Sequence, residues 1–281
     1  MKKKMLMLMA AAVVAACSNS DYSEYSDNSD HSQKVTLTFS PYQQEAMTRS
    51  AVSIADVVNH LDVWLYESGS EVTAIHQTTS DASFGSVSVT LDKTKTYTLY
   101  AVAHKADGAT LSDGVITFAN DKVTHAMYYS TTFTPATTTN LSCLMQRIVA
   151  QFRIETTDAV PDAAKKIQIT IDDVFDRWSI TAGGTHQVNR VSTVAITSTA
   201  NDGTVAINVF AIVTDAQTTH TVTVTAFDAD DHEVQSARVF ADVPLRNGYR
   251  TTYRGALFID TGFAGTFTVE NDWNEYDTVN F

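Results

Sequence analysis

The sequence predicts an all-β protein built from two tandem antiparallel β-sandwich domains. Hydrophobic and polar residues alternate along most of the chain, which is the pattern of strands with one buried face. Turn pairs such as Asp107-Gly108 and Asn247-Gly248 separate the alternating segments. The pattern gives about twelve to sixteen strands, more than a single standard sandwich holds, so we expect two domains.

The first 17 residues have the organisation of a secretory signal. Lys2, Lys3 and Lys4 form a basic start, the apolar stretch that follows is too short to span a bilayer, and small residues precede Cys17. A cysteine at this position resembles the bacterial lipobox, in which the thiol is acylated and the cysteine becomes the first residue of the mature chain. Two acyl chains anchor a protein stably, so the resemblance implies an outer-membrane lipoprotein held by Cys17.

Residues 18–33 are predicted to be a disordered polar tether. They consist mainly of Ser, Asp, Asn, Glu and Tyr, with no hydrophobic run that could offset the entropy cost of ordering. Acidic residues just after the lipid-carrying cysteine resemble the surface-export signals of Bacteroidetes lipoproteins. That resemblance implies a location on the outside of the cell.

Charge and cysteine content narrow the possible partners. The formal net charge of -13 disfavours binding to nucleic acid, whose phosphates carry the same sign, and electrostatic adhesion to anionic lipids. The chain has two cysteines. Once Cys17 carries lipid, Cys143 has no partner within the chain, so we expect no disulfide and interpret Cys143 as a buried, unreactive thiol.

The N-terminal sandwich is expected over residues 34–140. In its first strand Val35, Leu37 and Phe39 alternate with threonines, and a short helical turn is expected near residues 53–60. The domain boundary is placed at the end of an aperiodic, threonine-rich stretch that contains Pro135. Further strands are expected at residues 61–65, 87–91 and 97–103.

The C-terminal sandwich is expected over residues 141–281. Its alternating segments are rich in threonine and valine, which fit pleated surfaces with one solvent-exposed face. A helical turn is expected near residues 158–166, where Pro161 suits the first turn. The expected strands are residues 148–154, 167–171, 205–213, 220–227 and 251–259.

The order of several motifs resembles one known family. The lipobox and tether are followed by a first strand at residues 34–40, the pair Thr48-Arg49 and the strand at residues 61–66 (LDVWLY). Later come residues 91–103 (LDKTKTYTLYAVA), 145–150 (MQRIVA) and 247–258 (NGYRTTYRGALF). This order resembles the fimbrillin superfamily of Bacteroidales, which supplies the stalk, tip and anchor subunits of type V pili.

The resemblance implies two transthyretin-like domains and assembly by strand donation. A protease cuts after an arginine, the first strand leaves, and a neighbouring subunit supplies a strand to the opened groove. Here the removable strand would be residues 35–39 and the cleavage site Arg49. The donor would be the C-terminus, where hydrophobic residues occupy odd positions: Phe267, Val269, Trp273, Val279 and Phe281. The alternatives are a solvated loop arginine and a last strand folded into its own domain.

No catalytic motif is evident in the sequence, so we expect no enzymatic activity, no cofactor and no metal. The eight histidines show no metal-ligand spacing, and neither a nucleophile elbow nor a phosphate-binding loop occurs. Two acidic clusters offer oxygen ligands for Ca²⁺, but aspartate is also a preferred turn residue. The clusters are Asp172-Asp173 with Asp176, and Asp228, Asp230 and Asp231 with His232.

The leading interpretation is a structural and adhesive component of a cell-surface fimbria, either a pilus subunit or its lipid-anchored base. Its partners would be other fimbrial subunits, the outer membrane, and ligands on host or bacterial surfaces. The alternative is a surface glycan-binding lipoprotein of a polysaccharide-uptake system, which would need exposed aromatic rings. Trp64, Trp178 and Trp273 are the candidates for such a platform.

Overall fold

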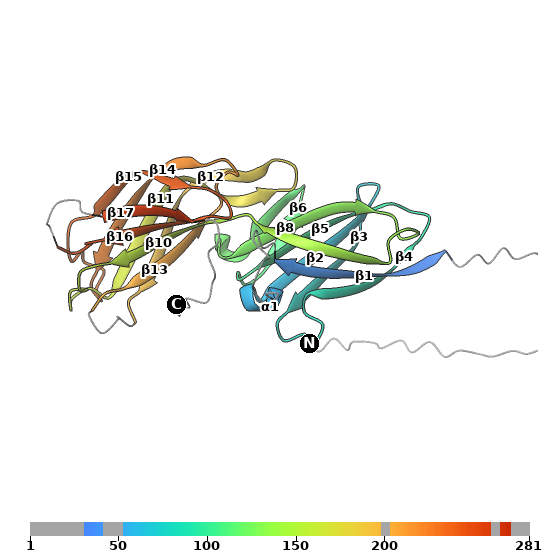
Figure 1. The fold of residues 1–281 in the computed structure, drawn as a ribbon, viewed down its shortest axis with the longest axis horizontal. Coiled ribbons are helices and arrows are strands. Elements are labelled where there is room, and N and C mark those ends of the chain that lie inside the picture. The colour runs from blue at the N-terminus through green and yellow to red at the C-terminus, as the bar shows by residue number, and fades with distance from the viewer. Residues whose placement is uncertain (1–30, 42–52, 198–202, 260–264, 271–281) are drawn as a thin grey trace, which may run out of the picture. The chain divides into compact units, whose positions relative to one another are not determined.

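The computed structural model describes residues 31–41, 53–197, 203–259 and 265–270, and the chain from Ser32 onward forms one compact unit (Figure 1). Regular structure in these residues is nearly all β, which confirms the predicted fold class. No helix among them is long and hydrophobic enough to cross a membrane. Cys17, most of the predicted tether and Arg49 lie outside the described residues.

The first sheet has seven strands that surround one hydrophobic core. Alternation explains this core, because Leu61, Val63 and Leu65 are all buried while successive side chains point to opposite faces. A one-turn helix, α1 (Ile54–Val57), also contributes to the core. In spatial order the strands are β3 (Ser70–Thr78), β2 (His60–Glu67), β5 (Tyr97–His104), β8 (Ala126–Phe133), β9 (Asn140–Arg147), β1 (Ser32–Pro41) and β4 (Ser86–Asp92).

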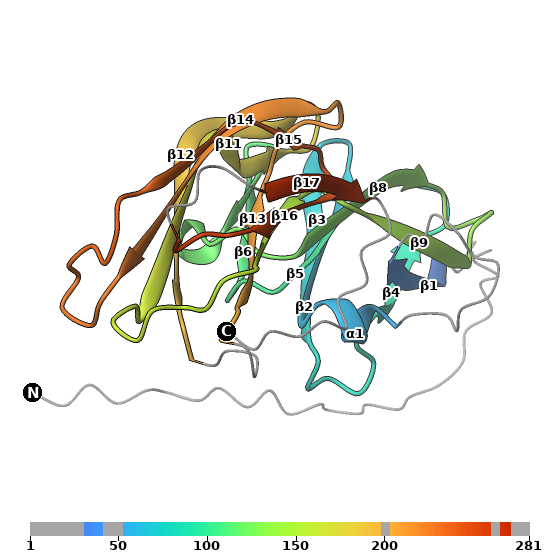
Figure 2. The same cartoon turned by 60° about the vertical axis from the view of Figure 1, so that its left-hand side comes forward.

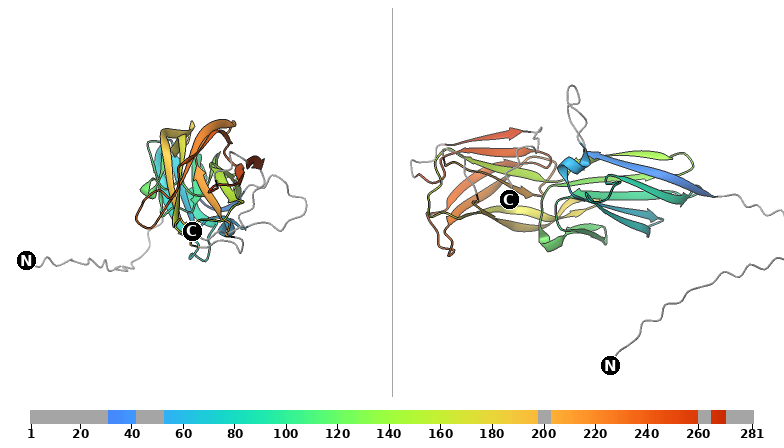
Figure 3. Two further views of the ribbon diagram at one scale, coloured as in Figure 1. Left: turned by 90° about the vertical axis from the view of Figure 1, so that its left-hand side faces the viewer. Right: turned by 90° about the horizontal axis from the view of Figure 1, so that it is seen from below.

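Two further sheets share a second core, so they form a sandwich (Figure 2; Figure 3). One has the order β13 (Ala206–Ala211), β10 (Ala150–Thr156), β16 (Arg250–Gly255) and β17 (Gly265–Glu270). The other has the order β15 (Arg238–Leu245), β14 (Thr218–Phe227), β11 (Lys166–Ser179), β7 (Val115–Phe118) and β6 (Ala109–Ser112), and β12 (Gly183–Ala195) also pairs with β11.

A third hydrophobic cluster contains residues from both halves of the sequence, among them Trp64, Val102, Ile116 and Trp178. The halves also meet where β7 pairs with β11, since Ile116 lies opposite Trp178. Strand β9 pairs with β1 and β8, whereas β10 begins the second sandwich. The division into domains at residues 34–140 and 141–281 therefore stays a prediction.

The two expected helical turns have different outcomes. α1 forms within residues 53–60, and a capping box explains its start: Ser53 Oγ accepts from Ala55 N–H, and the Asp56 carboxylate accepts from Ser53 N–H. The turn expected near residues 158–166 does not become a helix. Its chain makes an isolated turn in which Ala164 N–H donates to the Pro161 carbonyl.

Candidate functional site: the β1 slot

β1 is an internal strand that holds the outermost strand of its sheet. It pairs antiparallel with β4, where Val35 lies opposite Val89, and parallel with β9, where Phe39 lies opposite Cys143. Among the described residues, β4 has no other strand partner. β9 is joined to β8 by only two residue pairs. The integrity of this edge of the sheet therefore depends on β1.

The buried face of β1 defines the candidate site. The side chains of Val35, Leu37 and Phe39 are 0%, 0% and 3% exposed, which confirms the buried alternation predicted for residues 35–39. We call the position that these three side chains occupy between β9 and β4 the β1 slot. Its walls belong to the first core and include Val87, Leu91, Cys143 and Met145.

Both edges of the β1 slot offer backbone hydrogen bonds. Besides the two ladders, Thr36 N–H donates to the Thr139 carbonyl at 2.9 Å and Phe39 N–H donates to the Gly85 carbonyl at 2.8 Å. Without β1, the facing N–H and C=O groups of β4 and β9 would lose their partners beside an open apolar groove. An extended peptide with alternating hydrophobic side chains satisfies both requirements at once.

Cys143 lies at the base of the β1 slot with no exposed surface. Its Sγ is 3.8 Å from the Leu141 carbonyl oxygen, and burial raises the pKa of the thiol to about 12. The thiol is therefore protonated and unreactive at neutral pH. This confirms the interpretation of Cys143 as a buried, inert cysteine.

The turn before β4 packs tightly against α1. Gly85 has a φ of +85°, and a Cβ at this position would lie 2.6 Å from Ile54 Cγ2. Only glycine combines this backbone conformation with such a close approach. Residues 42–52, which connect β1 to α1 and include Arg49, lie outside the described residues, so the processing role of Arg49 stays a prediction.

The predicted donor segment is described only in part. β17 pairs antiparallel with β16, and Phe267 packs against the second core, where its ring lies 5.4 Å from that of Tyr253. Val269 is 39% exposed. Trp273, Val279 and Phe281 lie outside the described residues. In this structure residues 265–270 thus occupy their own sheet, and donation by the C-terminus stays a prediction.

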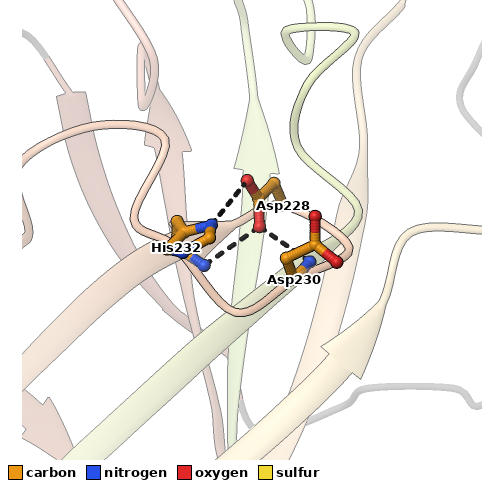
Figure 4. A group of neighbouring side chains, drawn as sticks. All are labelled: Asp228, Asp230 and His232. Carbon is orange, nitrogen blue, oxygen red and sulfur yellow. Dashed lines mark hydrogen bonds and ion pairs between the residues drawn. The ribbon is translucent and has the colours of Figure 1, made fainter.

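The second acidic cluster closes the turn between β14 and β15 (Figure 4). Asp228 Oδ1 accepts from the backbone N–H groups of Asp230 at 2.8 Å and His232 at 2.9 Å, and Oδ2 lies 3.4 Å from His232 Nδ1. The bond from His232 N–H is the main reason why the pKa of Asp228 is lowered. Ligand-atom positions on Asp228, Asp230 and His232 would fit a metal ion, but turn closure already explains them.

The first acidic cluster does not converge. The Asp176 carboxylate accepts from His186 Nδ1 at 2.7 Å, whereas Asp173 Oδ1 accepts from Gln187 Nε2 at 3.2 Å. Asp172 uses its backbone carbonyl, which lies 2.9 Å from His220 Nδ1. The three carboxylates therefore serve separate local contacts.

A histidine cluster was missed by sequence reasoning. The Asp62 carboxylate, almost fully buried, lies 2.7 Å from both His76 Nδ1 and His104 Nε2, and the His60 ring stacks on that of His104 at 5.3 Å. Burial, followed by the positive charges of His104 and His76, lowers the pKa of His60. These positions share no local spacing. The register that places Asp62 opposite His76 and His60 opposite His104 brings them together.

Two of the three candidate platform tryptophans are buried. Trp64 is 6% exposed and Trp178 is 8% exposed, both within the third hydrophobic cluster. Neither offers the exposed ring face that sugar stacking requires. Trp273 lies outside the described residues.

Comparison with known proteins identifies the fold. No family model and no curated protein matches the chain. A candidate adhesin from Bacteroides thetaiotaomicron is 12% identical, with 85% of this chain and 96% of that one covered at a TM-score of 0.52. The chain has the fold of this Bacteroides protein. It is also similar to a candidate polysaccharide-binding protein of the same species, at 10% identity, 88% and 100% coverage and a TM-score of 0.51.

A third similar structure is a candidate cell adhesion protein from Bacteroides eggerthii, at 10% identity, 85% and 96% coverage and a TM-score of 0.50. Identities this low establish the fold alone. That fold agrees with the resemblance found in the sequence.

Proposed function

We propose that this protein is a non-enzymatic structural and adhesive component of a cell-surface fimbria, and that its β1 slot accepts a strand from a neighbouring subunit. The observation that carries the proposal is that β1 alone, among the described strands, joins β4 to the rest of its sheet. Two of the three similar structures are candidate adhesion proteins, which supports the same role.

The chemistry of acceptance is that of β-strand addition. Cleavage after Arg49 would separate β1 from α1, and β1 would then be held only by its two ladders and by Val35, Leu37 and Phe39. A donor strand would replace the same backbone bonds and refill the same hydrophobic positions. The exchange is close to neutral in contacts, so a slowly released β1 gives a long-lived acceptor site.

The proposal includes lipidation at Cys17 and attachment to the outer membrane at the cell surface. As the lipid-anchored base of a fimbria the protein would keep both the lipid and β1. As a pilus subunit it would lose both at Arg49. The N-terminus of the protein recovered from native cell envelopes distinguishes the two roles, by sequencing and intact mass: a chain that begins at acylated Cys17 is a base subunit, and one that begins at Ser50 is a polymerising subunit.

The slot itself is tested by the reactivity of Cys143. The full chain, carrying Cys17→Ser so that one thiol remains, is treated with an arginine-specific protease and then with a maleimide. Cleavage at Arg49 is expected to expose Cys143 and permit labelling. Arg49→Lys is the matched control, because it keeps the charge and removes the cleavage site. Labelling of both proteins, or of neither after confirmed cleavage, contradicts the slot.

A further inference from the structure

An uncharged surface covers the outer face of the sheet made by β12, β11, β14 and β15. Pairing aligns one residue from each strand in a single row: Val191 lies opposite Thr170, Thr170 opposite Thr223, and Thr223 opposite Val239. A second row contains Thr193, Gln168 and Thr225. We call these seven residues the Thr/Val face.

The Thr/Val face points away from the second core. The neighbouring positions on the same strands, such as Ile169, Ile171, Val222 and Val224, are buried in that core, and side chains alternate between faces. Val191 is 54% exposed and Val239 is 59% exposed. Two large exposed hydrophobic residues in one row of a sheet form a patch rather than isolated surface positions.

The charge distribution distinguishes this face from the rest of the chain. None of its seven residues is ionisable, although the chain carries a net charge of -13. At one end Lys166 forms an ion pair with Asp231, and at the other end Asp172 begins the acidic cluster. A neutral centre with a charged rim is the usual composition of a protein interface.

The row is also symmetric, and this identifies the partner. Read across the four strands it is Val, Thr, Thr, Val. A two-fold axis parallel to the strands, between β11 and β14, would place Val191 against Val239 of a second copy and Thr170 against its Thr223. Such self-complementarity is the requirement for an isologous dimer interface. The absence of carboxylates spares two acidic copies from facing like charges there.

We propose that two copies of this chain associate face to face through the Thr/Val face. This contact lies on the second sandwich and needs no free strand, so it is independent of the β1 slot. In a fimbria it would join chains side by side, whereas strand donation would join them end to end.

The test is sedimentation equilibrium of the full chain with Cys17→Ser, over a range of protein concentrations. Intact mass confirms that β1 is present, which excludes strand exchange as the cause of association. The variant Val191→Asp/Val239→Asp places a carboxylate opposite another across the proposed contact, and its dissociation constant is expected to rise at least about tenfold. The matched control is Val72→Asp, because Val72 is 47% exposed on β3 of the first sheet.

A concentration-dependent dimer that is lost in the double variant and kept in the control supports the proposal. A monomer at all concentrations overturns it, and so does a dimer unaffected by the double variant. Circular dichroism melting shows whether the double variant is folded. If it is not, Thr170→Lys/Thr223→Lys tests the same row with long side chains that extend into solvent in the monomer.

Discussion

Phe39 lies directly opposite Cys143 in the parallel pairing of β1 with β9, and both side chains are buried in the first core. The register thus ties the packing of the removable strand to the accessibility of a single thiol. Any change that loosens the C-terminal half of β1 is expected to appear as cysteine reactivity before the protein unfolds globally.

Phe39→Ala is expected to lower the free energy of unfolding by about 3–5 kcal/mol, because it leaves a cavity in the first core. It should also increase the rate at which maleimide labels Cys143 under native conditions. Urea unfolding and labelling kinetics measure the two effects. Thr38→Ala is the control, since Thr38 lies on the exposed face of the same strand. Equal labelling rates in the two variants would contradict the packing described for β1.

Gly85→Ala is expected to destabilise the protein by about 2 kcal/mol or more, because it combines a left-handed φ with a Cβ 2.6 Å from Ile54 Cγ2. Gly69→Ala provides the comparison. Gly69 has a similar φ of +83°, but nothing lies within 4 Å of its added Cβ. The difference between the two melting temperatures isolates the clash with α1. Indistinguishable variants would mean that α1 does not pack against this turn.

Asp158→Asn is expected to lower stability by about 3 kcal/mol. The buried Asp158 carboxylate accepts from the backbone N–H groups of Leu257, Phe258 and Ile259, and asparagine offers one acceptor oxygen in place of two. Hydrogen exchange at these three amides should accelerate. Asp162→Asn, at an exposed position of the same loop, should leave exchange there unchanged. Slow exchange in Asp158→Asn would show that other groups hold the segment.

His60 is expected to make stability fall on acidification. Burial and the neighbouring His104 and His76 lower its pKa in the folded state below the unfolded value of 6.5. Below that value the unfolded chain therefore binds a proton that the folded chain resists, and unfolding is favoured. Between about pH 7.5 and about pH 5.5, the loss of stability in urea should be smaller for His60→Gln than for the wild type.

His232→Gln is the control for this pH dependence, because the His232 side chain is 77% exposed. Its loss of stability over the same interval should match that of the wild type. A His60→Gln variant with the wild-type slope would place the proton uptake elsewhere in the cluster with Asp62.

Local patterns in the sequence predicted the strands but not their partners. Alternation at Val35, Leu37 and Phe39 identified a strand with one buried face, and the Asp113-Gly114 turn lies where β6 meets β7. The parallel pairing of β1 with β9 joins segments about a hundred residues apart, and no local signal encodes it. The cluster around Asp62 was missed for the same reason.

Burial of the tryptophans was also set by distant contacts. Trp178 follows Asp176 and Arg177, a polar neighbourhood that suggested exposure. Strand β7 pairs beside it and covers the ring with residues such as Ile116. Tertiary packing outweighed the local composition, as it commonly does for aromatic residues.

The two neighbours of β1 run in opposite directions, since one pairs with it in parallel and the other antiparallel. A strand entering between them meets one parallel and one antiparallel neighbour whichever way it points, so backbone pairing alone carries no information about its polarity. The side chains that it replaces do carry that information, because they increase in size from Val35 to Leu37 to Phe39. A partner would therefore be oriented by this gradient of volume, with its bulkiest residue at the end where Phe39 now lies.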